Sequence, residues 1–190
     1  MIIARREPVD FYFSFRSPYS YLAAPRVFEL EKRFRIGLEF RGVLPLSTTQ
    51  PGALPKAKAL YILRDCRREA RRLRMPFGPV WDPGGHGDRR CLAAAEVARG
   101  EGLLEEFVLH VSRAIWTRAA DVGSDSVLEG LCDDVGVSWA AVRASIASEE
   151  HSERLQDNRA RLEAAGHWGV PTLVFRDEPF WGQDLSLIHI

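Results

Sequence analysis

Hydrophobic and polar positions alternate near the start of the chain with the period of a β-strand. From Val9 to Phe15 every second residue is valine or phenylalanine, and the residues between them are Asp10, Tyr12 and Ser14. This alternation predicts a half-buried strand over residues 9–15.

A helix is predicted to follow this strand directly. Ser17 can cap a helix through its hydroxyl, and Pro18 has the fixed φ that suits a first helical residue. Apolar residues continue at helical spacing to about Arg35, and Gly37 ends the pattern. Residues 38–41 then alternate again. A strand, helix, strand succession is normally parallel, so the opening is predicted to be a βαβ unit.

The middle of the chain, residues 53–166, is predicted to be helical throughout. Its apolar residues recur at three- and four-residue intervals in several runs that glycine-rich breaks separate. Within it, residues 76–88 (PFGPVWDPGGHGD) are rich in proline and glycine and are predicted to form a flexible loop at the rim of a site.

A β-hairpin is predicted near the end of the chain. VPTLVF at residues 170–175 has the composition of a strand, residues 177–179 of a turn, and Phe180 and Trp181 of a short return strand. The order βαβ, helices, ββ predicts an α/β protein of thioredoxin-like fold with a central all-helical insertion. The thioredoxin-like domain takes residues 1–52 and 167–190, and the insertion takes residues 53–166.

Composition and charge exclude several classes of function. The chain has 190 residues, 46% hydrophobic and 27% charged, which is typical of a globular domain. Because 26 basic residues balance 26 acidic ones, no net field attracts a nucleic acid or an anionic membrane. A basic block at residues 56–74 and an acidic block at 121–150 are interpreted as solvated helix faces. No apolar run is long enough for a signal peptide or a membrane span, so a cytoplasmic protein is expected.

The predicted junction of the first strand and helix carries Ser17-Pro18-Tyr19-Ser20. In thioredoxin-like proteins the reactive group lies here, because the helix N-terminus stabilises an anion. Redox members place two cysteines at this point, whereas a hydroxyl cannot exchange a disulfide. Ser17 can instead donate a hydrogen bond to a thiolate that a ligand supplies, or it can simply cap the helix. The three cysteines and five histidines are scattered, so no metal site is expected.

Three segments carry a resemblance to a known family. VDFYFSFRSPYSYLA, KAKALYILRDCRREA and GVPTLVFRDEPFWGQD resemble the corresponding segments of the 2-hydroxychromene-2-carboxylate isomerases, which are related to the kappa-class glutathione transferases within the DsbA-like thioredoxin superfamily. The match runs in order from about Val9 to Asp184.

This resemblance implies a glutathione site. Ser17 matches the catalytic serine that contacts the glutathione sulfur, and Pro171 would follow a cis peptide bond that exposes the Val170 backbone to the glutathione peptide. The resemblance further implies glutathione contacts at Trp181, Gly182, Gln183 and Asp184, with Asp184 near the γ-glutamyl ammonium. Asp184 could also cap a following helix.

Candidates for binding an aromatic carboxylate substrate are less specific. Lys56 and Lys58 could offer a cation, with Tyr61 nearby, although a solvated helix face is the favoured interpretation. The remaining candidates are Gln50, Trp81, His86 and Trp116, of which an isolated tryptophan on a helix is often a core residue.

The resemblance implies an isomerase with glutathione as cofactor. Its substrate would be 2-hydroxychromene-2-carboxylate or a similar ring-fission product of aromatic degradation. Glutathione would add to a conjugated double bond and then leave, which gives the trans isomer. For 2-hydroxychromene-2-carboxylate that product is trans-o-hydroxybenzylidenepyruvate. A glutathione transferase and a non-catalytic binding module are the alternatives, and a homodimer is expected because similar proteins are usually dimers.

The sequence departs from the family at two places. Residues 47–50 (STTQ) lack the asparagine that the family carries after the second strand, and Gln50 is expected to replace it. Residues 185–190 (LSLIHI) stand where the family continues into a last helix. We expect a truncated chain with a foreign tail, and therefore a less stable domain with exposed apolar surface.

Overall fold

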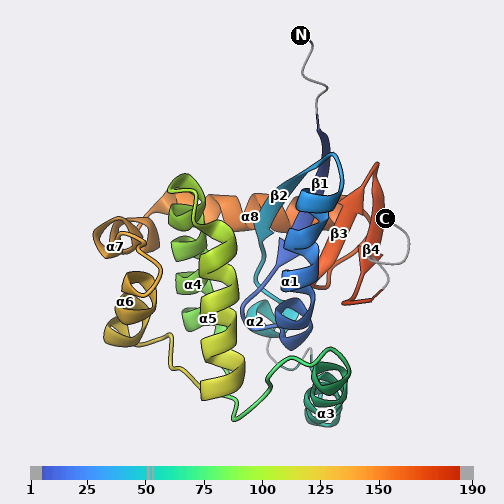
Figure 1. The fold of residues 1–190 in the computed structure, drawn as a ribbon, viewed down its shortest axis with the longest axis horizontal. Helices are drawn as coiled ribbons and strands as arrows, with labels where there is room; N and C mark the ends of the chain where they lie inside the picture. The colour runs from blue at the N-terminus through green and yellow to red at the C-terminus, as the bar shows by residue number, and fades with distance from the viewer. Residues whose placement is uncertain (1–5, 51, 53, 185–190) are drawn as a thin grey trace.

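The structure is a computed structural model that describes residues 6–50, 52 and 54–184. Its sheet has four strands in the order β2-β1-β3-β4 (Figure 1). The strands are β1 (Glu7–Phe13), β2 (Ile36–Gly42), β3 (Thr172–Phe175) and β4 (Glu178–Trp181). Two strands from each end of the sequence therefore form one sheet, and the α/β fold is as predicted.

The opening βαβ unit is confirmed. Helix α1 (Pro18–Arg33) connects β1 to β2, and the two strands pair in parallel from Glu7 opposite Ile36 to Phe13 opposite Gly42. β3 pairs with β1 in the antiparallel sense, with Leu173 opposite Phe11. This pairing brings the segment before β3 next to the end of β1, where α1 begins.

The predicted hairpin is present, but its turn lies earlier than residues 177–179. Arg176 and Asp177 have φ values of 52° and 63°, as the two central residues of a type I′ turn require. Glu178 and Pro179 belong to β4. Pro179 is tolerated there because β4 is an edge strand, where a missing N–H costs no interior ladder bond.

Seven helices fill the interval between β2 and β3 in the part of the chain that the structure describes. They are α2 (Leu46–Thr49), α3 (Lys56–Arg72), α4 (Gly84–Gly100), α5 (Leu104–Arg118), α6 (Asp125–Asp133), α7 (Trp139–Ile146) and α8 (Glu149–Ala164). The loop predicted over residues 76–88 is wrong at its end, because α4 already begins at Gly84. A buried anchor at Asp88, described below, fixes this first turn of α4 despite its three glycines.

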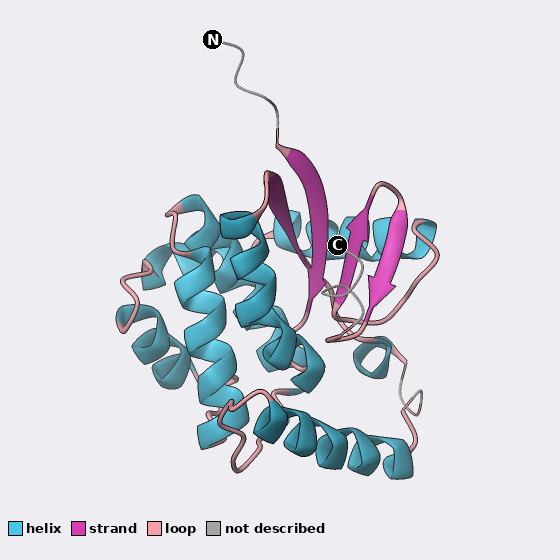
Figure 2. Cartoon of the chain, turned by 45° about the vertical axis from the view of Figure 1, so that its right-hand side comes forward, coloured by secondary structure: helices cyan, strands magenta, loops and turns pink. Residues whose placement is uncertain are grey.

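Helices cover both faces of the sheet. Phe11 and Phe13 of β1 are fully buried in the main core, which includes residues of α1, while Tyr12 faces the other way and packs in a small cluster with Leu162 of α8. Both views show α8 crossing behind the strands (Figures 1 and 2). The last helix of the predicted insertion thus lies against the sheet, and the division at residues 52 and 167 stays a prediction.

Two sequence-based expectations concern the ends and the surroundings of the chain. The tail at 185–190, with the missing last helix, lies outside the described residues. Among the helices that the structure does describe, none is both long and apolar enough to cross a membrane.

Candidate functional site

Ser17 lies where the end of β1 meets the start of α1 and the segment before β3. As the N-cap of α1, its Oγ accepts a hydrogen bond from the Ser20 N–H at 3.2 Å. The same hydroxyl donates to the Val170 carbonyl at 3.2 Å. Only 9% of Ser17 is exposed. The hydroxyl is thus both a helix cap and a contact to a second segment, so the two roles considered from the sequence coexist.

The segment opposite Ser17 contains a cis peptide bond between Val170 and Pro171, as predicted. The Pro171 carbonyl accepts from the Gly182 N–H at 2.9 Å, and the Thr172 hydroxyl donates to the Gly169 carbonyl at 2.8 Å. The first bond ties the start of β3 to the end of β4, and the second holds the turn around the cis bond. The Val170 backbone and residues 182–184 therefore face the same space.

That space is a cleft of about 540 Å³. One wall comes from the hairpin side, namely Val170, Pro171 and residues 181–184, and the other from the first turn of α1 and from α3. The members of the second wall are Tyr19, Asp65, Glu69 and Arg72. Ser17 is not among the lining residues, but its hydroxyl is hydrogen-bonded to Val170, which is.

Gln183 holds the end of the hairpin to both helices of the cleft. The Arg26 guanidinium of α1 donates to the Gln183 backbone carbonyl at 2.8 Å and to its side-chain oxygen at 2.6 Å. The side-chain amide of Gln183 donates to Glu69 of α3 at 2.9 Å. Because Gln183 is only 6% exposed, its side chain acts as a brace, while its neighbours Gly182 and Asp184 also line the cleft.

The charges of the cleft are mixed. Hydrogen bonds from Arg72, at 2.7 and 2.9 Å, lower the pKa of the Glu69 carboxyl, so Glu69 is ionised at neutral pH. The Tyr19 hydroxyl donates to Asp65 at 2.7 Å. Burial and this bond to a carboxylate raise the pKa of Tyr19, so the phenol stays protonated. Asp184 is exposed at the cleft. The cleft can therefore take a ligand that carries both a cation and hydrogen-bonding groups.

Aromatic side chains border the hairpin wall. The His167 ring stacks on Trp168 with centroids 4.7 Å apart, and Trp181 lies 4.9 Å away on a tilted plane. The His167 Nδ1 accepts from the Gly169 N–H at 3.0 Å. A methyl group at Gly169 would lie 2.7 Å from the indole nitrogen of Trp181. The glycine thus lets the backbone approach the ring that lines the cleft.

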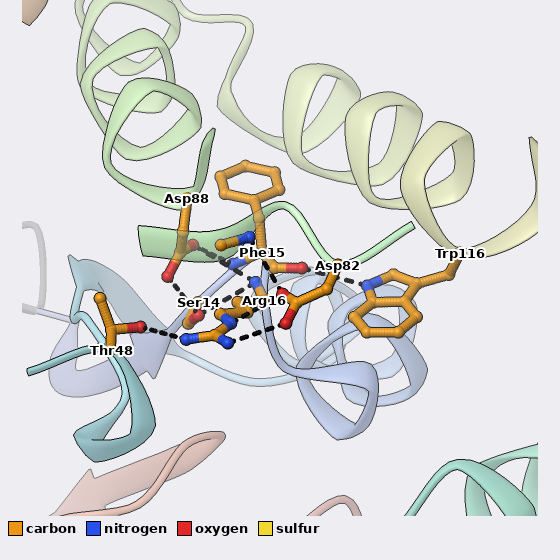
Figure 3. Close-up of polar contacts among 8 residues, drawn as sticks. Ser14, Phe15, Arg16, Thr48, Asp82, Asp88 and Trp116 are labelled. Atoms are coloured by element: carbon orange, nitrogen blue, oxygen red, sulfur yellow. Dashed lines mark hydrogen bonds and ion pairs between the residues drawn. The ribbon is translucent and has the colours of Figure 1, made fainter. Parts of the chain in front are cut away.

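The residues just before Ser17 are fixed by a polar cluster (Figure 3). The buried Asp88 carboxylate of α4 accepts from the Ser14 hydroxyl and from the backbone N–H groups of Phe15 and Arg16, at 2.8, 2.9 and 3.3 Å. The Arg16 guanidinium binds both oxygens of Asp82, at 2.7 and 2.8 Å, and also the Thr48 hydroxyl.

Several candidates from the sequence lie away from the cleft. Trp116 is 3% exposed; its indole N–H donates to the Phe15 carbonyl at 3.1 Å and its ring stacks on Phe77. It is a core residue outside the lining of the cleft, so its position gives no support to a role in substrate binding. Trp81 is 54% exposed, and Gln50, Lys56, Lys58 and His86 are exposed outside the lining of the cleft. Their role as substrate contacts stays a prediction.

Tyr61 differs from the other substrate candidates. It precedes Asp65 by four residues and Glu69 by eight on α3, so it lies on the helix face that lines the cleft. It is 59% exposed. Tyr61 therefore remains a candidate contact at the end of the cleft.

Sequence patterns alone do not single out Tyr19, Asp65, Glu69 and Arg72 as cleft residues or Asp88 as an anchor. The three residues of α3 stand at i, i+4 and i+7, which places them on one helix face. That spacing was visible, but the basic block around them had been interpreted as a solvated face. Asp88 was hidden in a segment taken for a loop.

None of the cysteines lines the cleft. Cys66, Cys91 and Cys132 are all buried and free. Burial raises the pKa of the Cys66 and Cys91 thiols, so both stay protonated at neutral pH. Among the described residues no three metal-binding side chains lie together.

A parallel βαβ unit, an antiparallel hairpin and a helix N-terminus facing a cis-proline define a thioredoxin-like protein, here with serine where redox members have cysteine. A family model described as the DSBA-like thioredoxin domain matches residues 8–186. The chain belongs to this family.

Relatives with established names point to one branch of it. The chain is 28% identical to a 2-hydroxychromene-2-carboxylate isomerase of Sphingobium xenophagum, over 93% of this chain and 92% of that protein. It is 25% identical to the Pseudomonas putida protein of the same name, over 93% and 89%. A solved 2-hydroxychromene-2-carboxylate isomerase superposes with a TM-score of 0.77 at 25% identity, covering 95% of this chain and 91% of that one. The disulfide reductase DsbM of Pseudomonas aeruginosa shares the fold at 17% identity and a TM-score of 0.71, covering 91% and 87%.

Proposed function

We propose that this protein is a glutathione-dependent cis–trans isomerase of 2-hydroxychromene-2-carboxylate or a similar product of aromatic ring fission. The observation that carries the proposal is the meeting of the Ser17 hydroxyl, the N-terminus of α1 and the Val170 carbonyl beside the cleft. Three relatives that bear the isomerase name support the reaction class.

The donor set of the site fits glutathione. A thiolate needs a hydrogen-bond donor and a positive field, which the Ser17 hydroxyl and the helix N-terminus offer. A peptide N–H needs an acceptor, which the Val170 carbonyl offers once the serine hydroxyl turns away. An ammonium group needs a carboxylate, which Asp184 offers at the open end of the cleft.

Ser17 would exchange one hydrogen bond for another when the ligand binds. The hydroxyl has a single proton, which it donates to the Val170 carbonyl in this structure. Redirecting that proton to a sulfur anion frees the carbonyl for the cysteinyl N–H of the ligand. Lowering a thiol pKa by ~2 units needs ~2.7 kcal/mol. One charge-assisted hydrogen bond at ~1.5–3 kcal/mol and a helix N-terminus at up to ~2 kcal/mol supply that amount.

When bound, glutathione supplies a thiolate that adds to the conjugated double bond of the ring-opened substrate and leaves after rotation, so it is regenerated. The chain's own residues bind, orient and ionise it. Ser17 stabilises the sulfur anion, the Val170 backbone aligns the peptide, and the brace of Arg26 and Gln183 holds residues 182–184 in place. Tyr61 and the exposed cations of α3 are the candidates for the substrate carboxylate.

The decisive experiment is calorimetric titration of glutathione into the wild-type chain and into Ser17→Ala, with S-methylglutathione as the ligand that lacks an ionisable thiol. We expect binding that weakens on methylation and a variant that no longer distinguishes the two ligands. Ser138→Ala is a matched control, because Ser138 also caps a helix through its side chain, at α7. Absence of glutathione binding to the folded wild-type chain would overturn the proposal.

A turnover assay then separates isomerisation from conjugation. We expect chromene carboxylate to isomerise while the glutathione concentration stays constant, and Ser17→Ala to lose far more turnover than affinity. Consumption of glutathione in proportion to product would instead make the protein a transferase.

A further inference from the structure

The segment from Ser14 to Arg16 decides where the Ser17 hydroxyl lies. It is the whole connection between the last residue of β1 and the N-cap of α1. The Ser17 N–H donates to the Ser14 carbonyl at 3.2 Å, and the Arg16 N–H donates to the Ser14 hydroxyl at 3.1 Å. A shift of this short turn would move Ser17 relative to Val170.

One side chain from the helical insertion holds most of this turn. The Asp88 carboxylate accepts three hydrogen bonds from it, one from the Ser14 hydroxyl to Oδ2 and two from successive backbone N–H groups to Oδ1 (Figure 3). Asp88 is fully buried. It lies 74 positions from Ser14 in the sequence, so the anchor exists only in the folded chain.

Asp88 has no ion pair to explain its burial. The Arg16 guanidinium is committed to Asp82 and Thr48, and in the described part of the chain no cation lies within ion-pair distance of Asp88. A buried carboxyl is costly unless donors satisfy it. Here all three donors belong to the turn before Ser17. The buried carboxyl is therefore satisfied entirely by the segment that leads into the candidate site.

We propose that Asp88 is a positioning residue for Ser17: its hydrogen bonds to Ser14, Phe15 and Arg16 hold the serine hydroxyl where it can stabilise the glutathione thiolate. This inference rests on the proposed function. Other supports of the turn include the Trp116 indole N–H, which holds the Phe15 carbonyl, and the pair of Arg16 and Asp82.

The groups that bear on Asp88 are few. Burial raises its pKa to about 7, while the bonds from the turn and the nearby Arg16 charge oppose this rise. From its own helix the Cys91 thiol approaches it, and that thiol stays protonated because burial raises its pKa. A protonated Asp88 still accepts at Oδ1 and can donate from Oδ2 to the Ser14 hydroxyl. Positioning therefore depends on the bonds rather than on the charge.

This distinction determines the variants. Asp88→Asn keeps an acceptor for the two backbone N–H groups and offers a donor to Ser14, so it should preserve the turn. Asp88→Ala removes the acceptor of all three hydrogen bonds. Asn158→Ala is a matched control, because Asn158 is also buried and also binds a strand end, donating to the Gly42 carbonyl at 3.0 Å, but it holds β2 rather than the turn before Ser17.

The readout is the pKa of the thiol of bound glutathione, followed by the ultraviolet absorbance of its thiolate at saturating ligand. In Asp88→Ala we expect this pKa to rise by ~1 unit, a tenfold loss of thiolate at a pH well below it. In Asp88→Asn and Asn158→Ala the thiol pKa should keep the wild-type value. In Asp88→Ala the glutathione affinity should fall by less than the tenfold loss of thiolate.

Two results would overturn the positioning role alone. One is a folded Asp88→Ala with the wild-type thiol pKa, and the other is an Asn158→Ala that raises the pKa equally. If circular dichroism shows that Asp88→Ala does not fold, Ser14→Ala decides by the same criterion, because it removes one donor and leaves Asp88 in place. A wild-type complex whose thiol pKa equals that of free glutathione would overturn the proposed function and this inference together.

Discussion

The Arg26 guanidinium reaches both the backbone carbonyl and the side-chain oxygen of Gln183, at 2.8 and 2.6 Å, although the residues are 157 positions apart. Since Gln183 lies between Gly182 and Asp184, which line the cleft, this pair holds that part of the hairpin wall to α1. Replacing Arg26 by methionine keeps most of the aliphatic stem and removes both bonds.

We expect Arg26→Met to weaken glutathione binding by about tenfold, equivalent to ~1.4 kcal/mol. Isothermal titration calorimetry measures this change in the dissociation constant. The control is Arg154→Met, which removes ion pairs to Glu96 and Glu150, none of these three residues lining the cleft. Equal affinities in Arg26→Met and the wild type would show that the brace does not support the ligand.

Tyr19 and Tyr21 offer a matched comparison within α1. The Tyr19 hydroxyl donates to Asp65 of α3 within one wall of the cleft, at 2.7 Å, and the Tyr21 hydroxyl donates to the Pro76 carbonyl at 2.6 Å. Each Tyr→Phe change should lower the free energy of unfolding by ~1 kcal/mol. Only Tyr19→Phe should also reduce glutathione affinity, because only Tyr19 lines the cleft. Urea unfolding measures the change in stability, and calorimetry measures the change in glutathione affinity. An equal loss of affinity in both variants would contradict the assignment of Tyr19 to the cleft.

Asp88 should make stability depend on pH in an unusual direction. Its pKa rises from 3.8 to about 7 on folding, so between these values the folded chain holds a proton that the unfolded chain releases. The contribution of Asp88 to stability is therefore complete below about pH 4 and is lost as the pH rises to 7.

Because other carboxyls titrate too, the measurement is the difference in the free energy of unfolding between Asp88→Asn and the wild type. This difference should shift in favour of the variant from pH 4 to pH 7 and then stay constant. A difference that does not change over that interval would mean that Asp88 has an ordinary pKa.

Gly169 should tolerate no side chain. A methyl group there would lie 2.7 Å from the Trp181 indole nitrogen and 3.0 Å from the His167 ring, so Gly169→Ala must displace rings beside the cleft. We expect a loss of ~1–3 kcal/mol in stability and a change in tryptophan fluorescence. Gly100→Ala is the control, since nothing lies within 4 Å of its added methyl. Unchanged fluorescence in Gly169→Ala would contradict this packing.

Local patterns predicted the elements that carry the site but not most of the residues that surround it. The alternation before Phe15 and the Ser17-Pro18 pair located β1 and the start of α1. That Ser17 and Val170 would serve the same ligand came from the resemblance, and the hydrogen bond between them came from the structure. Asp88 and Arg26 escaped notice because their partners are 74 and 157 positions away, and only the folded topology brings such residues together.

The burial of all three cysteines has a practical consequence. Because all three cysteines are buried, the chain offers no exposed thiol of its own to an alkylating agent. Any iodoacetamide-sensitive group in a glutathione complex would belong to the ligand, so the rate of alkylation would report directly on how the site activates that sulfur.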